Sequence, residues 1–163
     1  MEPMAQRIDP RYFNSLIDAN VLDRLGSADD AIVDEILSLY DDGKVSLLLP
    51  HSVKTEIEHP NTPADVKRRA LPFIYTEPVS LTSAEVQRHQ QVRDLVRGNA
   101  RPGKHDRDAY HMVEAAKYGG YFITHDPRLI KKRSEVAQIL GRGFAIVTPT
   151  EFLDAYRRFE GEP

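Results

Sequence analysis

The sequence contains no cysteine among its 163 residues. Disulfide bonds, thiolate nucleophiles and cysteine-based zinc sites are therefore excluded. Long apolar runs are also missing, because the longest, such as Val45–Leu49, are far too short to span a bilayer. The first residues, 1–9, lack the apolar core of a signal peptide. We therefore expect a cytoplasmic protein that has no membrane partner.

An excess of positive charge is absent as well, since the net charge is −3 and the pI is near 6.1. A protein that coats nucleic acid would be basic overall. An enzyme that binds nucleic acid through a local patch remains possible, because metal ions held by acidic residues can supply positive charge at a phosphate. With 40% hydrophobic and 29% charged residues, the chain is expected to fold as one globular domain over residues 1–163.

Short apolar segments alternate with helical patterns along the chain. Strands are expected at residues 14–18, 45–49, 78–81, 121–124 and 144–147. Helices are expected at about 83–97, opened by a Thr82–Glu85 capping box, at about 106–118 and 127–140, and after Thr148. Because the strands are nearly continuous apolar runs that alternate with helices, the sequence predicts an α/β fold with a parallel sheet covered on both faces.

Four acidic residues stand at the ends of predicted strands or near the starts of predicted helices: Asp18, Glu56, Asp108 and Asp126. In a parallel sheet these positions can converge on one edge, where α/β proteins bind their ligands. Four carboxylates with no basic partner between them would repel one another, so they imply a bound divalent cation. Oxygen ligands favour Mg²⁺ or Mn²⁺, and such an ion can activate water for phosphodiester hydrolysis.

Each of these acids also has an ordinary structural explanation. Asp126 precedes Pro127 and is a good candidate for a helix N-cap. Asp18 could likewise cap the turn that follows it, Glu56 could be a solvated helix residue, and Asp108 gains a little from the helix dipole. It is the joint placement of the four acids that favours a shared site.

Histidines and basic residues near the acids also have both a functional and an ordinary structural interpretation. His105, His111 and His125 could form a metal cluster, but we favour a solvated His105, a partly buried His111 and a loop His125. The carboxylates already account for a metal.

Basic residues flank Asp108 and follow Asp126, and among these Arg107 and Arg128 are candidates for contact with a phosphate of the substrate.

Several short motifs, taken in order, resemble those of the PIN-domain nucleases. They are Leu16–Val21, Pro50–Glu56, Asp106–His111, Phe122–Asp126 and the closing Val147–Leu153. The resemblance covers about residues 14–156. It implies a three-layer αβα sandwich around a five-stranded parallel sheet in the order 3-2-1-4-5, with Mg²⁺- or Mn²⁺-dependent endoribonuclease activity. Many members are VapC-like toxins inhibited by an antitoxin protein, often as dimers, so an antitoxin and a homodimer are possible partners besides RNA.

Carried over by position, the resemblance assigns metal binding and catalysis to Asp18, Glu56, Asp108 and Asp126. Asn20 matches the polar residue two positions after the first acid, and Thr124 matches the hydroxyl residue two positions before the last. Asp106 stays open as a further metal ligand, because it lies two residues before Asp108. His125 stands where many members have a different polar residue.

Two other function classes compete with a metal-dependent endoribonuclease. The first is a catalytically silent PIN-like module that binds RNA or a protein partner. The second is a phosphatase-like or receiver-like α/β domain that uses one aspartate as a phosphoryl acceptor. This last class would need a well-placed lysine and a different spacing of acids, so we rank it below the others.

Overall fold

The computed structural model describes residues 8–23, 30–77, 80–100, 106–118, 120–141 and 143–161. Its five strands pair in parallel, in the order β3-β2-β1-β4-β5. They are β1 (Asn14–Ile17), β2 (Ser46–Leu49), β3 (Ile74–Tyr75), β4 (Gly120–Ile123) and β5 (Phe144–Val147). In the centre of the sheet, Leu16 of β1 pairs with Leu48 of β2 and with Phe122 of β4. The predicted α/β class and the strand order 3-2-1-4-5 are confirmed.

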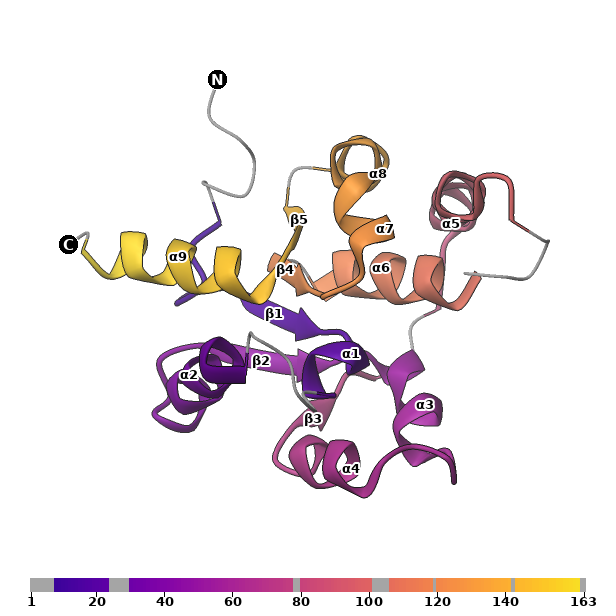
Figure 1. Ribbon diagram of the computed structural model, residues 1–163. Helices are drawn as coiled ribbons and strands as arrows, with labels where there is room; N and C mark the ends of the chain where they lie inside the picture. Colours follow the sequence, from indigo (N-terminus) through magenta and orange to yellow (C-terminus); the bar gives the residue numbers. More distant parts are fainter. Residues whose placement is uncertain are drawn as a thin grey trace.

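Helices cover both faces of this sheet, which gives three layers (Figure 1). On one face lie α5 (Ser83–Arg97), α6 (Asp106–Tyr118), α7 (Pro127–Lys131) and α8 (Arg133–Leu140). On the other lie α1 (Ala19–Leu22), α2 (Asp30–Asp41), the 3-10 helix η2 (His51–Val53), α3 (Lys54–Glu58), α4 (Ala64–Ala70) and α9 (Pro149–Glu160). Among the described residues, no helix is both long enough and apolar enough to cross a membrane.

Strand β4 shows why the strands lack a polar face. All four of its residues are buried, because successive side chains point to opposite faces and both faces are covered. Tyr121 packs edge-on against Phe152 of α9, with ring centroids 5.7 Å apart. Phe122 belongs to the opposite cluster, with Met112 of α6. A strand buried on both faces reads as a continuous apolar run, as the sequence predicted.

The strand predicted at 78–81 is wrong. The third strand is β3, at Ile74–Tyr75, whereas residues 78 and 79 lie outside the described residues and Ser80–Leu81 form no strand. β3 pairs with β2, and the N–H of Thr76 continues the pairing by donating to the carbonyl of Leu49. β3 is only two residues long and lies at the sheet edge, with Ile74 exposed. It belongs to an apolar stretch, Leu71–Tyr75, that follows α4 directly and contains Pro72, so the sequence does not set it apart as a strand.

The predicted helix boundaries are confirmed in part. Thr82 and Glu85 form the expected capping box of α5, and Thr148 caps α9 through a second capping box with Glu151. The single helix expected over 127–140 is instead two, α7 and α8, separated at Lys132, whose φ of −101° and ψ of 8° break the helical path. At its other end, α7 begins directly after Asp126, which stands at its N-cap.

Candidate functional site

Asp18 follows β1 directly and is almost completely buried, with 6% of its surface exposed. Its side chain does not cap α1, although it stands at the N-cap position. Instead, Oδ2 accepts hydrogen bonds from the hydroxyl of Thr124, at 2.8 Å, and from the amide of Asn20, at 3.3 Å. Capping therefore does not account for this carboxylate, and its position needs another explanation.

Asn20 and Thr124 hold together the chain segments that leave β1 and β4. The Asn20 amide nitrogen also donates to the Thr124 hydroxyl oxygen, at 3.2 Å, and its amide oxygen accepts from the backbone N–H of His125. The same Thr124 oxygen accepts from the backbone N–H of Asp126, at 3.1 Å. These bonds fix the turn that carries Asp126 relative to Asp18.

The electrostatic environment of Asp18 includes two of the other predicted acids. Burial raises the pKa of Asp18 to about 6, the Thr124 hydrogen bond and His111 oppose that rise, and the negative charges of Asp108 and Glu56 add to it. A carboxyl group that is buried among like charges favours a nearby cation. All of these residues follow or face the carboxyl ends of β1 and β4, so the structure brings them to one edge of the sheet.

Asp126 and Asp108 are linked through a single guanidinium group. Asp126 caps α7, because its Oδ1 accepts from the backbone N–H of Arg128 at 2.9 Å. Nη2 of Arg128 then donates to Oδ2 of Asp126, at 2.7 Å, and to Oδ2 of Asp108, at 3.0 Å. The expectation that no basic partner lies between the acids is therefore wrong, because in the folded chain Arg128 reaches back from the first turn of α7. The capping role of Asp126 is confirmed.

Glu56, on α3, has two basic neighbours from α6. Its Oε1 lies 3.5 Å from Nε2 of His111 and 3.4 Å from Nη1 of Arg107. The hydrogen bond from His111 lowers the pKa of Glu56, and burial opposes the shift, while the charge of His111 and the charge and hydrogen bond of Arg107 add to it. His111 is 1% exposed, so the prediction of a partly buried histidine was wrong. Its burial follows from its place on the inner face of α6 beside Met112.

Asp106 and Asp108 face different partners, although both lie in the first turn of α6. Asp106 accepts from Arg97 of α5, at 2.9 Å, while Asp108 accepts from Arg128 beside Asp126. His105, the other residue in question here, lies outside the described residues. The geometry thus joins Asp108, and not Asp106, to the last acid.

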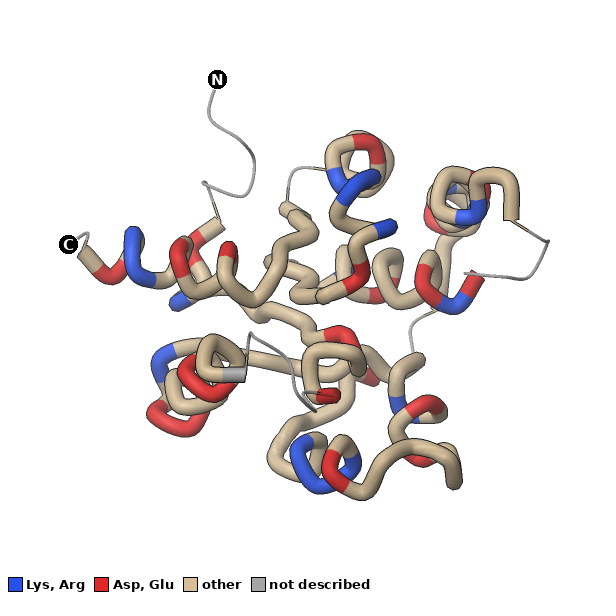
Figure 2. Tube along the Cα trace, in the orientation of Figure 1, with Lys and Arg blue, Asp and Glu red and all other residues tan. Residues whose placement is uncertain are grey.

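Charge beyond the strand ends is mixed, and Figure 2 shows acidic and basic segments there side by side. Within the described part of the chain, no three Asp, Glu or His side chains lie close enough to hold one metal ion. The carboxylate oxygens are nevertheless of the type that Mg²⁺ and Mn²⁺ prefer, and buried Asp18 lacks a cationic hydrogen-bond partner among the described residues. The residues therefore suit such an ion chemically. An ion bound at Oδ2 of Asp108 or of Asp126 would compete with the guanidinium of Arg128 for that oxygen.

Sequence reasoning did not single out Ser52 and Glu114, which lie behind Glu56. Glu114 is completely buried and accepts from both the backbone N–H and the hydroxyl of Ser52. A signal was present in the sequence, because Glu114 interrupts the otherwise apolar run Met112–Ala116 of a helix. An acid in such a run is rarely buried without a specific partner.

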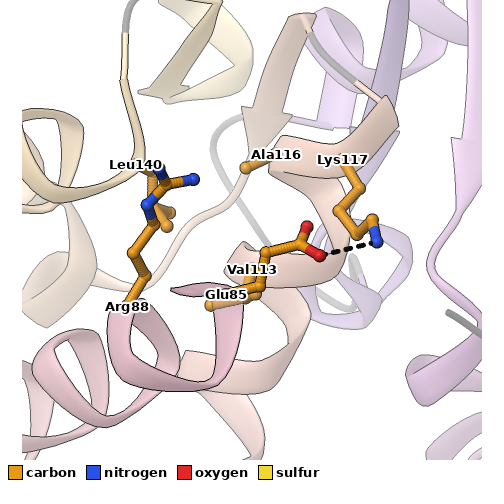
Figure 3. Close-up of a pocket in the computed structure, with 6 residues that line it drawn as sticks. All are labelled: Glu85, Arg88, Val113, Ala116, Lys117 and Leu140. Atoms are coloured by element: carbon orange, nitrogen blue, oxygen red, sulfur yellow. Dashed lines mark hydrogen bonds and ion pairs between the residues drawn. The ribbon is translucent and has the colours of Figure 1, made fainter. Parts of the chain in front are cut away.

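A pocket of about 80 Å³ lies away from the acids, between α5, α6 and the end of α8. On its wall, Nζ of Lys117 donates to Oε1 of Glu85 at 3.0 Å. The dashed line in Figure 3 marks this pair. Lys117 also donates to the backbone carbonyl of Ser80. Because none of the predicted acids lines this pocket and its Glu85–Lys117 pair holds α5 against α6, it is not part of the candidate site.

The described side chains thus form a connected polar site at the carboxyl edge of the sheet. Asp18 is held by Thr124 and Asn20, while the remaining acids are held by cationic groups. No protein-family model matches the chain, and a search of curated proteins finds no similar sequence.

Proposed function

We propose that the chain is a PIN-type, metal-dependent endoribonuclease that hydrolyses RNA phosphodiester bonds with Mg²⁺ or Mn²⁺. One observation carries the proposal. Asp18 is buried, does not cap a helix, and has a pKa raised to about 6 by burial and by the acids Asp108 and Glu56. Such an arrangement costs stability, and proteins keep costly charged groups mainly at functional sites.

The four acids Asp18, Glu56, Asp108 and Asp126 would hold the metal after their side chains move closer together, because no three acidic or histidine side chains of the described residues lie close enough to hold one ion. A bound Mg²⁺ or Mn²⁺ ion would lower the pKa of a water molecule and neutralise charge on the phosphate. Thr124 and Asn20 orient the Asp18 carboxylate through their hydrogen bonds. Arg107 and Arg128, which now pair with the acids, place positive charge where a phosphate of the substrate would lie.

The proposal is tested by substituting single acids. We expect Asp18→Asn and Asp126→Asn each to lower Mn²⁺-stimulated cleavage of single-stranded RNA by at least about 100-fold, because each removes a charged ligand. Asp154→Asn, at an exposed acid of α9, is the matched control and should keep full activity. Circular dichroism of each variant confirms that the fold is retained. Full activity of purified Asp18→Asn or Asp126→Asn would refute the proposal.

A second candidate function is a PIN-like module that binds RNA or a protein without turnover. It is favoured by the pairing of Asp108 and Asp126 with Arg128, which already neutralises part of the acidic charge. Titration calorimetry with Mn²⁺ separates the two functions. A wild-type protein that binds RNA but neither binds Mn²⁺ nor cuts RNA would be such a module.

The same proposal includes partners. Resemblance to VapC-like toxins supports an antitoxin protein and a homodimer, acting in the cytoplasm. Light scattering of the purified chain measures the oligomeric state directly. Co-expression with the protein of a neighbouring gene, followed by an RNA cleavage assay, tests for an antitoxin, and loss of cleavage in the complex is the expected result.

A further inference from the structure

Helix α6 carries one glutamate that is completely buried, Glu114. Its Oε1 accepts from the backbone N–H of Ser52, at 3.1 Å, and from the Ser52 hydroxyl, at 3.0 Å. Its Oε2 has no hydrogen-bond partner among the described residues. Burying a carboxyl group is unfavourable unless its charge is balanced. The question is which group balances Glu114.

The Ser52 hydroxyl connects Glu114 to a histidine. Its Oγ lies 2.6 Å from Nδ1 of His111, and Nε2 on the other side of the ring lies 3.5 Å from Oε1 of Glu56. A continuous network therefore runs Glu114–Ser52–His111–Glu56 from the core to the candidate site. His111 is 1% exposed, so the ring has almost no access to water.

The network joins two helical segments through paired positions. Ser52 and Glu56 lie four residues apart on η2 and α3, and His111 and Glu114 lie three residues apart on α6. Side chains with these spacings share a helix face. Ser52 therefore contacts both His111 and Glu114, and Glu56 contacts His111. These contacts hold η2 and α3 against α6.

Counting hydrogens shows what this network does to the histidine. Ionised Glu56 can only accept, so Nε2 of His111 must carry a hydrogen to bond it. If the Ser52 hydroxyl donates to Glu114, Nδ1 is also protonated, and the charged ring balances Glu114. If the hydroxyl donates to Nδ1 instead, the 3.0 Å contact between Ser52 Oγ and Glu114 Oε1 needs a hydrogen from Glu114, so the carboxyl group carries the proton and is neutral. In both arrangements Glu114, Ser52 and His111 are together neutral, and Nε2–H points at Glu56.

We propose that Glu114 and Ser52 are positioning residues, which fix the His111 ring so that its Nε2–H holds the Glu56 carboxylate at the candidate site. Glu56 needs such support, because α3 is only five residues long and the other partner, Arg107, is mostly exposed. Groups behind a metal ligand orient it and tune its basicity. The consequence for metal binding rests on the proposed function, but the hydrogen-bond assignment does not.

The assignment is tested by ¹⁵N NMR of the histidine rings in the full chain without metal. In wild type we expect Nε2 of His111 to be protonated and its ring signals to shift in Ser52→Ala and Glu114→Gln. Glu56→Gln, at a partly exposed position that should not disturb folding, should shift the Nε2–H signal. Ser15→Ala is the control, because it removes the same group from a fully buried serine whose hydroxyl has no partner among the described residues. It should leave the His111 signals unchanged.

An unprotonated Nε2 in wild type, or identical His111 signals in wild type and Glu56→Gln, would overturn the proposal. A second measurement is Mn²⁺ affinity by calorimetry, where Ser52→Ala should bind about 10- to 100-fold more weakly than wild type and Ser15→Ala equally well. Equal affinities of folded Ser52→Ala and wild type would also overturn it. If wild type binds no Mn²⁺ at all, the proposed function fails, and the NMR result alone decides the inference.

Discussion

The hydroxyl of Thr124 donates a 2.8 Å hydrogen bond to Oδ2 of Asp18, although the two residues are 106 positions apart in sequence. Both side chains are buried, and they follow the neighbouring parallel strands β4 and β1. The bond is between a neutral donor and a carboxylate, so it compensates only part of the cost of burying the charge. Burial has a larger effect than the hydrogen bond, and the pKa of Asp18 is therefore raised from 3.8 to about 6.

Asp18→Asn should therefore stabilise the metal-free protein at pH 8. Raising a carboxyl pKa from 3.8 to about 6 corresponds to about 3 kcal/mol of unfavourable free energy when the group is ionised. Asparagine has nearly the same shape and can still accept from Thr124, without the charge. We expect its free energy of unfolding, measured with urea in the presence of a chelator, to exceed that of wild type by up to about 3 kcal/mol.

The advantage of Asp18→Asn should depend on pH. Between pH 3.8 and about 6, the folded state of wild type binds more protons at Asp18 than the unfolded state does. Wild type therefore gains stability as the pH falls through 6, and the difference from Asp18→Asn should shrink between pH 8 and pH 5. Asp154→Asn, at an exposed acid, is the control. A difference that stays constant over this range would contradict the buried-charge explanation.

Replacing Arg128 should increase the affinity for Mn²⁺. Its guanidinium bonds Asp108 and Asp126 together, so a metal ion and Arg128 compete for the same oxygens. Arg128→Gln removes the competing charge, and we expect Mn²⁺ to bind about 10-fold more tightly by calorimetry, equivalent to about 1.4 kcal/mol. Cleavage of RNA should nevertheless fall at low substrate concentration, because a phosphate contact is also lost.

The control for this variant is Arg133→Gln, because Arg133 also pairs with an acid, Glu151 at 2.7 Å, but away from the candidate site. Its Mn²⁺ affinity should match that of wild type. Weaker Mn²⁺ binding by Arg128→Gln would show that the arginine supports the ion and does not compete with it.

The sequence was sufficient to predict the strands that are buried on both faces of the sheet. β4 and β5 are buried on both faces, so they appear as continuous apolar runs, and the acids that follow β1 and β4 lie at the same edge of the sheet because the strands are parallel. The two-residue strand β3 was missed, because its short apolar stretch, Leu71–Tyr75, follows α4 directly and contains Pro72, and so short a run does not distinguish a strand from the end of a helix.

Within the site, sequence position predicted which acids share an edge but not what neutralises them. Arg128 follows Asp126 by only two residues, and nothing in this spacing shows that its side chain also reaches Asp108. The Glu114–Ser52 contact joins residues 62 positions apart, so it depends on how α6 packs against η2. Contacts of this kind are set by tertiary packing, which single-sequence patterns do not encode.

Gly120 should be intolerant of any side chain. Its φ of +81° is in the left-handed region, and a Cβ atom there would lie 1.9 Å from the carbonyl oxygen of Asn14 on the adjacent strand. We expect Gly120→Ala to lower the free energy of unfolding by about 3 kcal/mol or more, measured by urea denaturation. Gly143→Ala, where a Cβ atom would meet nothing within 4 Å, should change it by less than about 0.5 kcal/mol. Equal stabilities of the two variants would contradict the close strand approach.

Asp108 and Asp106 offer a comparison within one turn of α6. Asp108 shares Arg128 with Asp126, whereas Asp106 pairs with Arg97 on α5. If the acids bind metal together, Asp108→Asn should abolish Mn²⁺-dependent RNA cleavage, with a loss of at least about 100-fold. Asp106→Asn should keep activity within about threefold and lose only a partly exposed ion pair, worth at most about 1 kcal/mol.

The measurement is the initial rate of RNA cleavage at saturating Mn²⁺, with thermal unfolding of each variant as the check on folding. A larger loss in Asp106→Asn than in Asp108→Asn would mean that the start of α6 reorganises when metal binds and brings Asp106 into the site. Equal large losses would make both acids ligands. Because the two variants differ only in which carboxylate of the same helical turn is neutralised, a selective loss in Asp108→Asn would tie catalysis to the side that faces Asp126 and Asp18.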